Sequence, residues 1–159
     1  MTRTDIDDFI EPDSPIQAAA GKVGLALIPT LASTPEDLDM AFATISTQHA
    51  DVLIVLGGVP HSTQRERIAE LAIKIGMPTV FLARAYVQAG GLLSYGARTD
   101  DLYARPAAFV DKILRGINPG DLPIEQPTRF ELAINLRTAS ALGISVPQSL
   151  LISADELVR

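Results

Sequence analysis

Short apolar runs alternate with amphipathic segments along the first hundred positions of the chain. Near-continuous apolar runs at residues 23–28, 51–56 and 79–82 predict buried strands. Between them, apolar residues recur at i, i+3, i+4 and i+7, which predicts two helices with one buried face each. These faces consist of Leu38, Ala41, Phe42 and Ile45, and of Ile68, Leu71, Ala72 and Ile75. The alternation predicts an α/β fold, a three-layer parallel sheet with helices on both faces.

Residues 90–96, with the sequence GGLLSYG, place two hydroxyl groups between glycines at the end of a fourth short strand. Carboxyl ends of parallel strands share one edge of a sheet, and ligands bind at that edge in open α/β folds. This edge would gather His61, Arg84, Ser94 and Tyr95. The guanidinium of Arg84 suits a ligand carboxylate, because it can form bidentate charge-assisted bonds. A tight turn with a structural tyrosine is the alternative interpretation of the stretch.

The second half of the chain follows a different pattern. Residues 99–116 form a long amphipathic helix, in which Pro106 predicts a kink or break near residues 104–106. The N-terminal stretch is acidic and polar, so residues 1–15 are predicted to be a disordered leader before a single domain over residues 16–159. The other expected elements are a helix that starts at Thr34 and Pro35, a proline-punctuated crossover at 118–128, a strand at 130–135, a short helix at 136–142 and an extended segment at 147–152.

Composition narrows the classes of function. The net charge of -6 disfavours nucleic acid and anionic membrane surfaces as partners. Cysteine is absent, which excludes disulfides, thiolate catalysis and cysteine-ligated metals. No apolar run approaches the roughly 18 residues of a transmembrane helix, so membrane insertion is not expected. The N-terminus also lacks the basic and apolar regions of a secretory signal peptide.

Catalytic patterns are missing from the sequence. Neither histidine, His49 or His61, stands in a recognisable catalytic arrangement, and no nucleophile elbow or phosphate-binding loop follows a strand. The pair Gly57-Gly58 before a helix is weak support for a phosphate site. We therefore expect no catalytic residue, no metal and no cofactor, and a chain that is not an enzyme. A small flavodoxin-like nucleotide-handling enzyme and a non-binding assembly protein remain as alternatives.

Three segments resemble a known family. They are residues 90–96, residues 103–116 with the run FVDKIL, and residues 121–139 with the sequence DLPIEQPTRFELAINLRTA. From about Ile16 onward, the chain resembles the C-terminal half of an ABC-transporter substrate-binding protein of the tryptophan/tyrosine type. Nearly all of that family's first lobe and its signal peptide have no counterpart in this sequence.

The resemblance implies one lobe of a type I periplasmic-binding fold together with one helix of the other lobe. Residues 99–120 would be the excursion into that other lobe. The implied function is to bind a small carboxylate or amino-acid-like solute without chemistry, as a component or remnant of an ABC importer. The positions implied for ligand contacts are Gly58, Val59, His61, Arg84, Ser94 and Tyr95.

The resemblance also carries expectations about partners and location. It implies an ABC permease as partner and a periplasmic location, although the sequence as written would stay in the cytoplasm. The helix at 99–116 would expose its apolar face without the first lobe, which predicts a homodimer through that helix.

Overall fold

The computed structural model describes residues 14–56 and 62–159, apart from the side chains of residues 102, 103 and 105. The chain divides into two compact units. The first comprises Met1–Asp51 and Gly57–Gln64, and the second comprises Val52–Leu56 and Arg65–Arg159. Most of the predicted leader lies outside the described residues, but its last two residues begin a helix.

The first unit contains helices α2 (Pro15–Lys22) and α3 (Asp37–Thr47). The hydroxyl of Ser14 caps α2 by accepting a hydrogen bond from the amide of Gln17 at 3.3 Å. In α3, the buried side chains are Leu38, Ala41, Phe42 and Ile45. This is the helical face that the spacing of apolar residues predicted.

The strand predicted at residues 23–28 is wrong. Val23, Gly24 and Leu25 instead close the end of α2, since their amides donate to the carbonyls of residues 20 and 21. Gly24 has a φ of 73°, which interrupts an extended strand. The side chains of Val23 and Leu25 are 71% and 55% exposed. An apolar run is therefore not enough to predict a strand here, because its first three residues form the C-terminal cap of α2.

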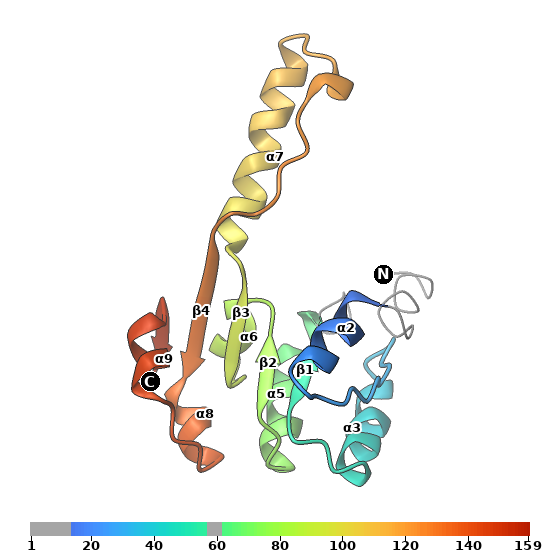
Figure 1. The fold of residues 1–159 in the computed structure, drawn as a ribbon, viewed down its shortest axis with the longest axis vertical. Helices are drawn as coiled ribbons and strands as arrows, with labels where there is room; N and C mark the ends of the chain where they lie inside the picture. Colours follow the sequence, from blue (N-terminus) through green and yellow to red (C-terminus); the bar gives the residue numbers. More distant parts are fainter. Residues whose placement is uncertain (1–13, 57–61) are drawn as a thin grey trace. The chain divides into compact units, whose positions relative to one another are not determined.

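The second unit is built on a sheet with the strand order β1-β2-β3-β4-β5 (Figure 1). Neighbouring strands are parallel except for β3 and β4, which are antiparallel. The α/β fold class is confirmed, with a mixed and mainly parallel sheet. The strands are β1 (Leu53–Val55), β2 (Thr79–Phe81), β3 (Leu93–Ala97), β4 (Phe130–Asn135) and β5 (Glu156–Val158).

The helices of the second unit connect these strands. Helix α6 packs against β3 and β4, and the ring of its Tyr86 stacks on Phe81 at 4.8 Å between centroids. The helices are α5 (Arg65–Lys74), α6 (Arg84–Gln88), α7 (Thr99–Leu114), α8 (Leu136–Ala141) and α9 (Gln148–Ser153), with a 3-10 turn η1 (Pro119–Asp121). The described core of this unit includes Ile68, Phe81, Val87 and Ile134, each no more than 2% exposed.

The structure shows no break in the helix over Thr99–Leu114, and the extended segment expected at 147–152 is wrong. Helix α7 continues through Pro106 without a break, although this residue has no amide hydrogen to donate to the carbonyl of residue 102. The remaining hydrogen bonds of a 16-residue helix hold it across that gap. The segment at 147–152 is not extended but forms most of α9, and β5 follows it.

Residues 98–129 form an arm that leaves the sheet at β3 and returns to it at β4. In Figure 1 the return segment after α7 runs back alongside the helix to β4. The amide of Arg98 donates to the carbonyl of Arg129 at 3.1 Å, and the Arg129 guanidinium pairs with Asp101. The base of the arm is therefore closed by contacts between its outgoing and returning ends.

Candidate functional site

The antiparallel pair of β3 and β4 places the beginning of β4 beside the end of β3. The register runs from Leu93 opposite Ile134 to Ala97 opposite Phe130. The carboxyl ends of β1, β2 and β3 share one edge because these strands are parallel. Side chains at the amino end of β4 therefore join the edge that the sequence assigned to ligand binding.

Three of the six predicted ligand-contact positions, Gly58, Val59 and His61, lie outside the described residues. Ser94 and Tyr95 are both on β3, but successive strand residues point to opposite faces of a sheet. Ser94 is 1% exposed, whereas Tyr95 is 56% exposed and stacks on Phe130 at 5.7 Å between centroids. The structure therefore does not bring the two hydroxyl groups to one surface.

Arg84 lies on the same face of the sheet as Ser94. It is the first residue of α6, and it contacts two carboxylates. Its Nη2 atom is 3.4 Å from Oδ2 of Asp100, and its Nη1 atom is 3.8 Å from Oε2 of Glu131. The guanidinium that was expected to take a ligand carboxylate is therefore already engaged by carboxylates of the chain.

Glu131 is a residue of this edge that the sequence analysis did not select. It is 8% exposed, and its Oε1 atom has no hydrogen-bond partner among the described residues. The same holds for Oγ of Ser94, on the same face of the β3–β4 pair. Buried polar atoms are normally hydrogen-bonded, so two unpartnered atoms on one face mark a place that lacks donors. The signal in the sequence was a glutamate at the second position of a strand that is otherwise rich in apolar residues.

A hollow of about 280 Å³ opens beside Glu131. Two carboxylates in its wall are already used, since Asp155 accepts from the amide of Leu132 at 2.8 Å and Glu156 accepts from Gln88 at 2.9 Å. Its lining residues are Arg84, Arg98, Glu131, Leu132, Ala133, Asp155 and Glu156. With two arginines and three acidic residues, the wall carries one more negative than positive charge. We call this space the β4 hollow.

Gly96 fixes how closely the chain packs behind the hollow. It pairs with Glu131 in the register of β3 and β4. A Cβ atom at Gly96 would lie 1.9 Å from the carbonyl oxygen of Leu82, so only glycine fits there. The last glycine of the 90–96 stretch is thus explained by the approach of the main chain that leads from β2 into α6.

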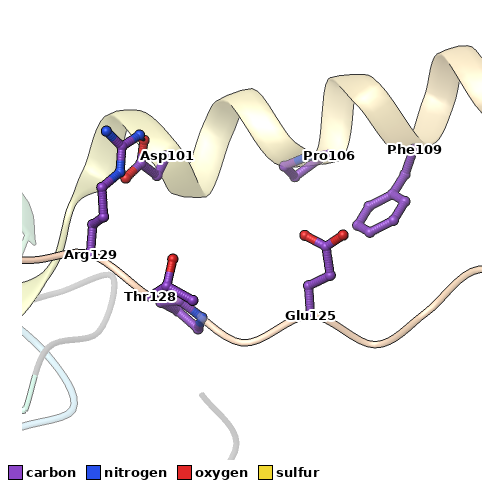
Figure 2. Close-up of a pocket in the computed structure, with 7 residues that line it drawn as sticks. Asp101, Pro106, Phe109, Glu125, Thr128 and Arg129 are labelled. Atoms are coloured by element: carbon purple, nitrogen blue, oxygen red, sulfur yellow. The ribbon is translucent and has the colours of Figure 1, made fainter.

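A second hollow, of about 180 Å³, lies within the arm between α7 and the return segment (Figure 2). Pro106, Phe109 and Pro127 supply apolar wall, while Asp101 and Arg129 form an ion pair in the same lining. Figure 2 shows these two charged side chains turned toward each other. The ammonium of Lys112 lies 5.6 Å from the centre of the Phe109 ring. The hollow is mainly apolar, and no residue predicted for ligand binding lines it.

Two absences concern only the part of the chain that the structure describes. Within residues 14–56 and 62–159, no three acidic or histidine side chains gather in a way that would hold a metal ion. Among the described helices, none combines the length and the apolarity that crossing a bilayer requires.

The chain is similar to proteins of known class. The family model described as ABC transporter substrate binding protein matches residues 14–158. No curated protein is similar enough in sequence to count as a match.

Solved structures show the same fold. A conserved domain protein from Vibrio cholerae is 27% identical, with a TM-score of 0.83 over 89% of this chain and 48% of its own. An ABC domain from Streptococcus pneumonia, in complex with L-Trp, is 22% identical, with a TM-score of 0.82 over 98% of this chain and 51% of its own. The ligand-free, open structure of a substrate-binding protein with adhesive properties from Clostridium difficile is 19% identical, with a TM-score of 0.63 over 94% of this chain and 51% of its own. This chain spans about half the length of each.

Proposed function

Because the chain belongs to the family of ABC transporter substrate binding proteins, we propose that it binds a small amino-acid-like solute without chemistry, as a component of an ABC importer. The observation that carries this proposal is the family match over residues 14–158. The L-Trp bound to a structural neighbour supports an amino acid as the class of solute. The permease of the importer would be its membrane partner, and the periplasm its place of action.

We place the binding surface at the edge where β3 ends and β4 begins. Arg84 and Ser94 lie on one face of this edge. Gly58, Val59 and His61 remain predictions from the sequence, because they lie outside the described residues. Tyr95 would serve a solute only from the opposite face. Substrate-binding proteins hold their solute at the ends of strands in an α/β lobe, which is the general position of ligands in such sheets.

A ligand screen tests the proposal. We expect L-amino acids, L-tryptophan among them, to raise the thermal unfolding midpoint of the 159-residue chain, because a ligand that binds only the folded state stabilises it. Nucleotides serve as the comparison set, since the alternative function is a nucleotide-handling enzyme. Stabilisation by nucleotides with no response to any amino acid would contradict solute binding and favour that alternative.

We also propose that residues 99–120 belong structurally to the lobe that the relatives carry in their other half. Apolar side chains of this region are exposed, with Val110 54%, Leu114 81% and Ile117 43% exposed. Contiguous exposed apolar surface marks an interaction site. In the 159-residue chain, a second copy would cover it, giving a homodimer through α7.

A further inference from the structure

The backbone joins the arm, residues 98–129, to the sheet through a short ribbon. Beyond Ser94 and Ala133, the ends of β3 and β4 pair with each other, and neither β2 nor β5 is in register with them. Two-stranded ribbons vary widely in twist, so this ribbon alone does not fix the direction in which the arm leaves the sheet. Side-chain contacts beside the ribbon therefore decide how firmly the arm is held.

Arg84 makes such a contact. It is the first residue of α6, which packs against β3 and β4, and its guanidinium lies between two carboxylates. Its Nη2 atom is 3.4 Å from Oδ2 of Asp100 in the first turn of α7, and its Nη1 atom is 3.8 Å from Oε2 of Glu131 in β4. One guanidinium thus links the arm to a helix and a strand of the sheet.

The two carboxylates differ in their exposure to solvent. The side chain of Glu131 is 10% exposed, whereas that of Asp100 is 66% exposed. Salt screens an exposed ion pair far more than a buried one, so the contact with Asp100 is the one that can be made and broken. The contact with Glu131 restricts the arginine beforehand, which lowers the entropy that Arg84 loses when it also binds Asp100.

The base of the arm moves as one piece with Asp100. The neighbouring Asp101 pairs with the guanidinium of Arg129 in the return segment. The amide of Arg98 donates to the carbonyl of Arg129 at 3.1 Å. Because these contacts join the outgoing and returning ends, a hold on Asp100 is a hold on the whole base of the arm.

We propose that Arg84 and Asp100 form an electrostatic latch, which holds the arm in one orientation against α6 and opens when the contact is screened or removed. Glu131 keeps the arginine in place while the latch is open. The latch is independent of solute binding, since it needs only residues of the chain itself. The direction in which α7 presents its exposed apolar face then depends on ionic strength.

Electron spin resonance distances between two labels test the latch. The chain has no cysteine, so Glu70→Cys on α5 and Ala108→Cys on α7, both at exposed positions, give two unique labelling sites. The labelled chain is diluted in a large excess of unlabelled chain, so that each distance lies within one molecule. At low salt we expect one main distance for the doubly labelled chain. Asp100→Asn should raise the fraction of molecules outside that peak about two- to fivefold, as expected for an exposed ion pair.

A second aspartate of the same helix provides the matched control. Asp111 pairs with Arg115 at 3.0 Å inside the arm, so Asp111→Asn should leave the distances unchanged. In about 1 M NaCl the Debye length falls to about 3 Å. There the labelled chain and Asp111→Asn should both broaden to the distribution of Asp100→Asn, which itself should change no further.

Asp100 also favours the start of α7 through the helix dipole, and Arg84→Gln separates this effect from the latch. It removes the same contact from α6 and leaves the start of α7 untouched, so it should broaden the distances as Asp100→Asn does. Broadening in Asp100→Asn alone, or equal broadening in Asp111→Asn, would overturn the latch. So would identical distributions for all chains at low salt. If Arg84→Gln does not fold, the salt series decides, because distances that stay unchanged in about 1 M NaCl would also refute the latch.

Discussion

Gly96 is the residue where a single added methyl group would have the clearest effect. Its Cβ would meet the carbonyl oxygen of Leu82 at 1.9 Å, and a backbone atom cannot move aside as the tip of a side chain can. We expect Gly96→Ala to lower the free energy of unfolding by about 2 kcal/mol or more, measured by urea denaturation.

Gly120→Ala is the matched control for this change. Its Cβ would lie 3.5 Å from Oδ1 of Asn118, which is an ordinary contact. We expect its effect to stay within about 0.5 kcal/mol, as for most surface substitutions. Equal losses for both variants would show that the approach of Leu82 to Gly96 is not tight in solution.

Asp37 stabilises the start of α3 in a way that depends on pH. Its Oδ2 atom accepts from the amides of Ser33 and Thr34 at 2.9 and 2.8 Å, and these bonds hold its pKa below the usual 3.8. When the pKa of a carboxyl group is lower in the folded than in the unfolded state, its ionised form stabilises the fold. This stabilisation is complete above the pKa of the unfolded state and is lost as the pH falls through the pKa of the folded state.

We therefore expect Asp37→Ala to lower the urea midpoint at pH 7, and the difference from the unmodified chain to shrink as the pH falls below about 3.8. Asp39→Ala, two residues later in the first turn of the same helix, is the comparison for loss of an acidic side chain near the helix start. A difference for Asp37→Ala that is constant between pH 7 and pH 2.5 would argue against the two charge-assisted hydrogen bonds.

Three elements meet at the side chain of Asn135. Its Oδ1 atom caps α8 by accepting from Thr138 at 3.1 Å, and its Nδ2 atom donates to the carbonyl of Val87 in α6 at 3.0 Å. The residue is 4% exposed, and it is the last of β4. We expect Asn135→Ala to lower the free energy of unfolding by about 2 kcal/mol, since it removes a cap and a buried hydrogen bond, while the Val87 carbonyl keeps the amide of Gly90 as a donor at 3.1 Å.

Asn118 offers the same residue type at an exposed cap. Its Oδ1 atom accepts from the amide of Gly120 at 3.0 Å at the start of η1. We expect Asn118→Ala to cost about 1 kcal/mol or less by the same urea measurement. The joint role of Asn135 would be refuted if the two alanine variants lost similar stability.

Elements that depend on local spacing were predictable from the sequence. The buried face of α3 follows from apolar residues at helical spacing, and Gly76, with a φ of 70°, ends α5 near the predicted position. Strands were harder, because a strand exists only with a partner. Val23–Ile28 has the composition of a strand but closes a helix, whereas β5 was missed because its pairing with β4 joins residues 133–135 to 156–158.

The candidate site was predictable only in part for a related reason. Residues 130–135 alternate as a strand with one face exposed, and in the structure Phe130 is 51% exposed while Glu131 is 8% exposed. Alternation along a strand tells which residues share a face, but not which face is covered. Which face is covered depends on the antiparallel pairing of β4 with β3. That pairing follows from the path of the arm between residues 98 and 129 and not from the local pattern of the strand.

At the scale of the whole molecule, the exposed face of α7 predicts self-association. We expect the chain to sediment as a dimer at micromolar concentration, and Leu114→Lys to raise the dimer dissociation constant at least about tenfold, because a charge would be buried in an apolar contact. Ile152→Lys is the control, since Ile152 is 75% exposed on α9. A monomer in the unmodified chain would contradict the dimer.

The antiparallel pair of β3 and β4 also acts as a mechanical joint. Beyond Ser94 and Ala133 the pair is a two-stranded ribbon, and sliding or stretching it would break the pairing at its three registered positions, from Tyr95–Leu132 to Ala97–Phe130. Twisting it costs far less, because isolated strand pairs tolerate a wide range of twist. A torque on the arm would therefore reach the sheet as rotation about the ribbon axis. The pair Gly96–Glu131 lies in this ribbon, one position from the end that joins the arm.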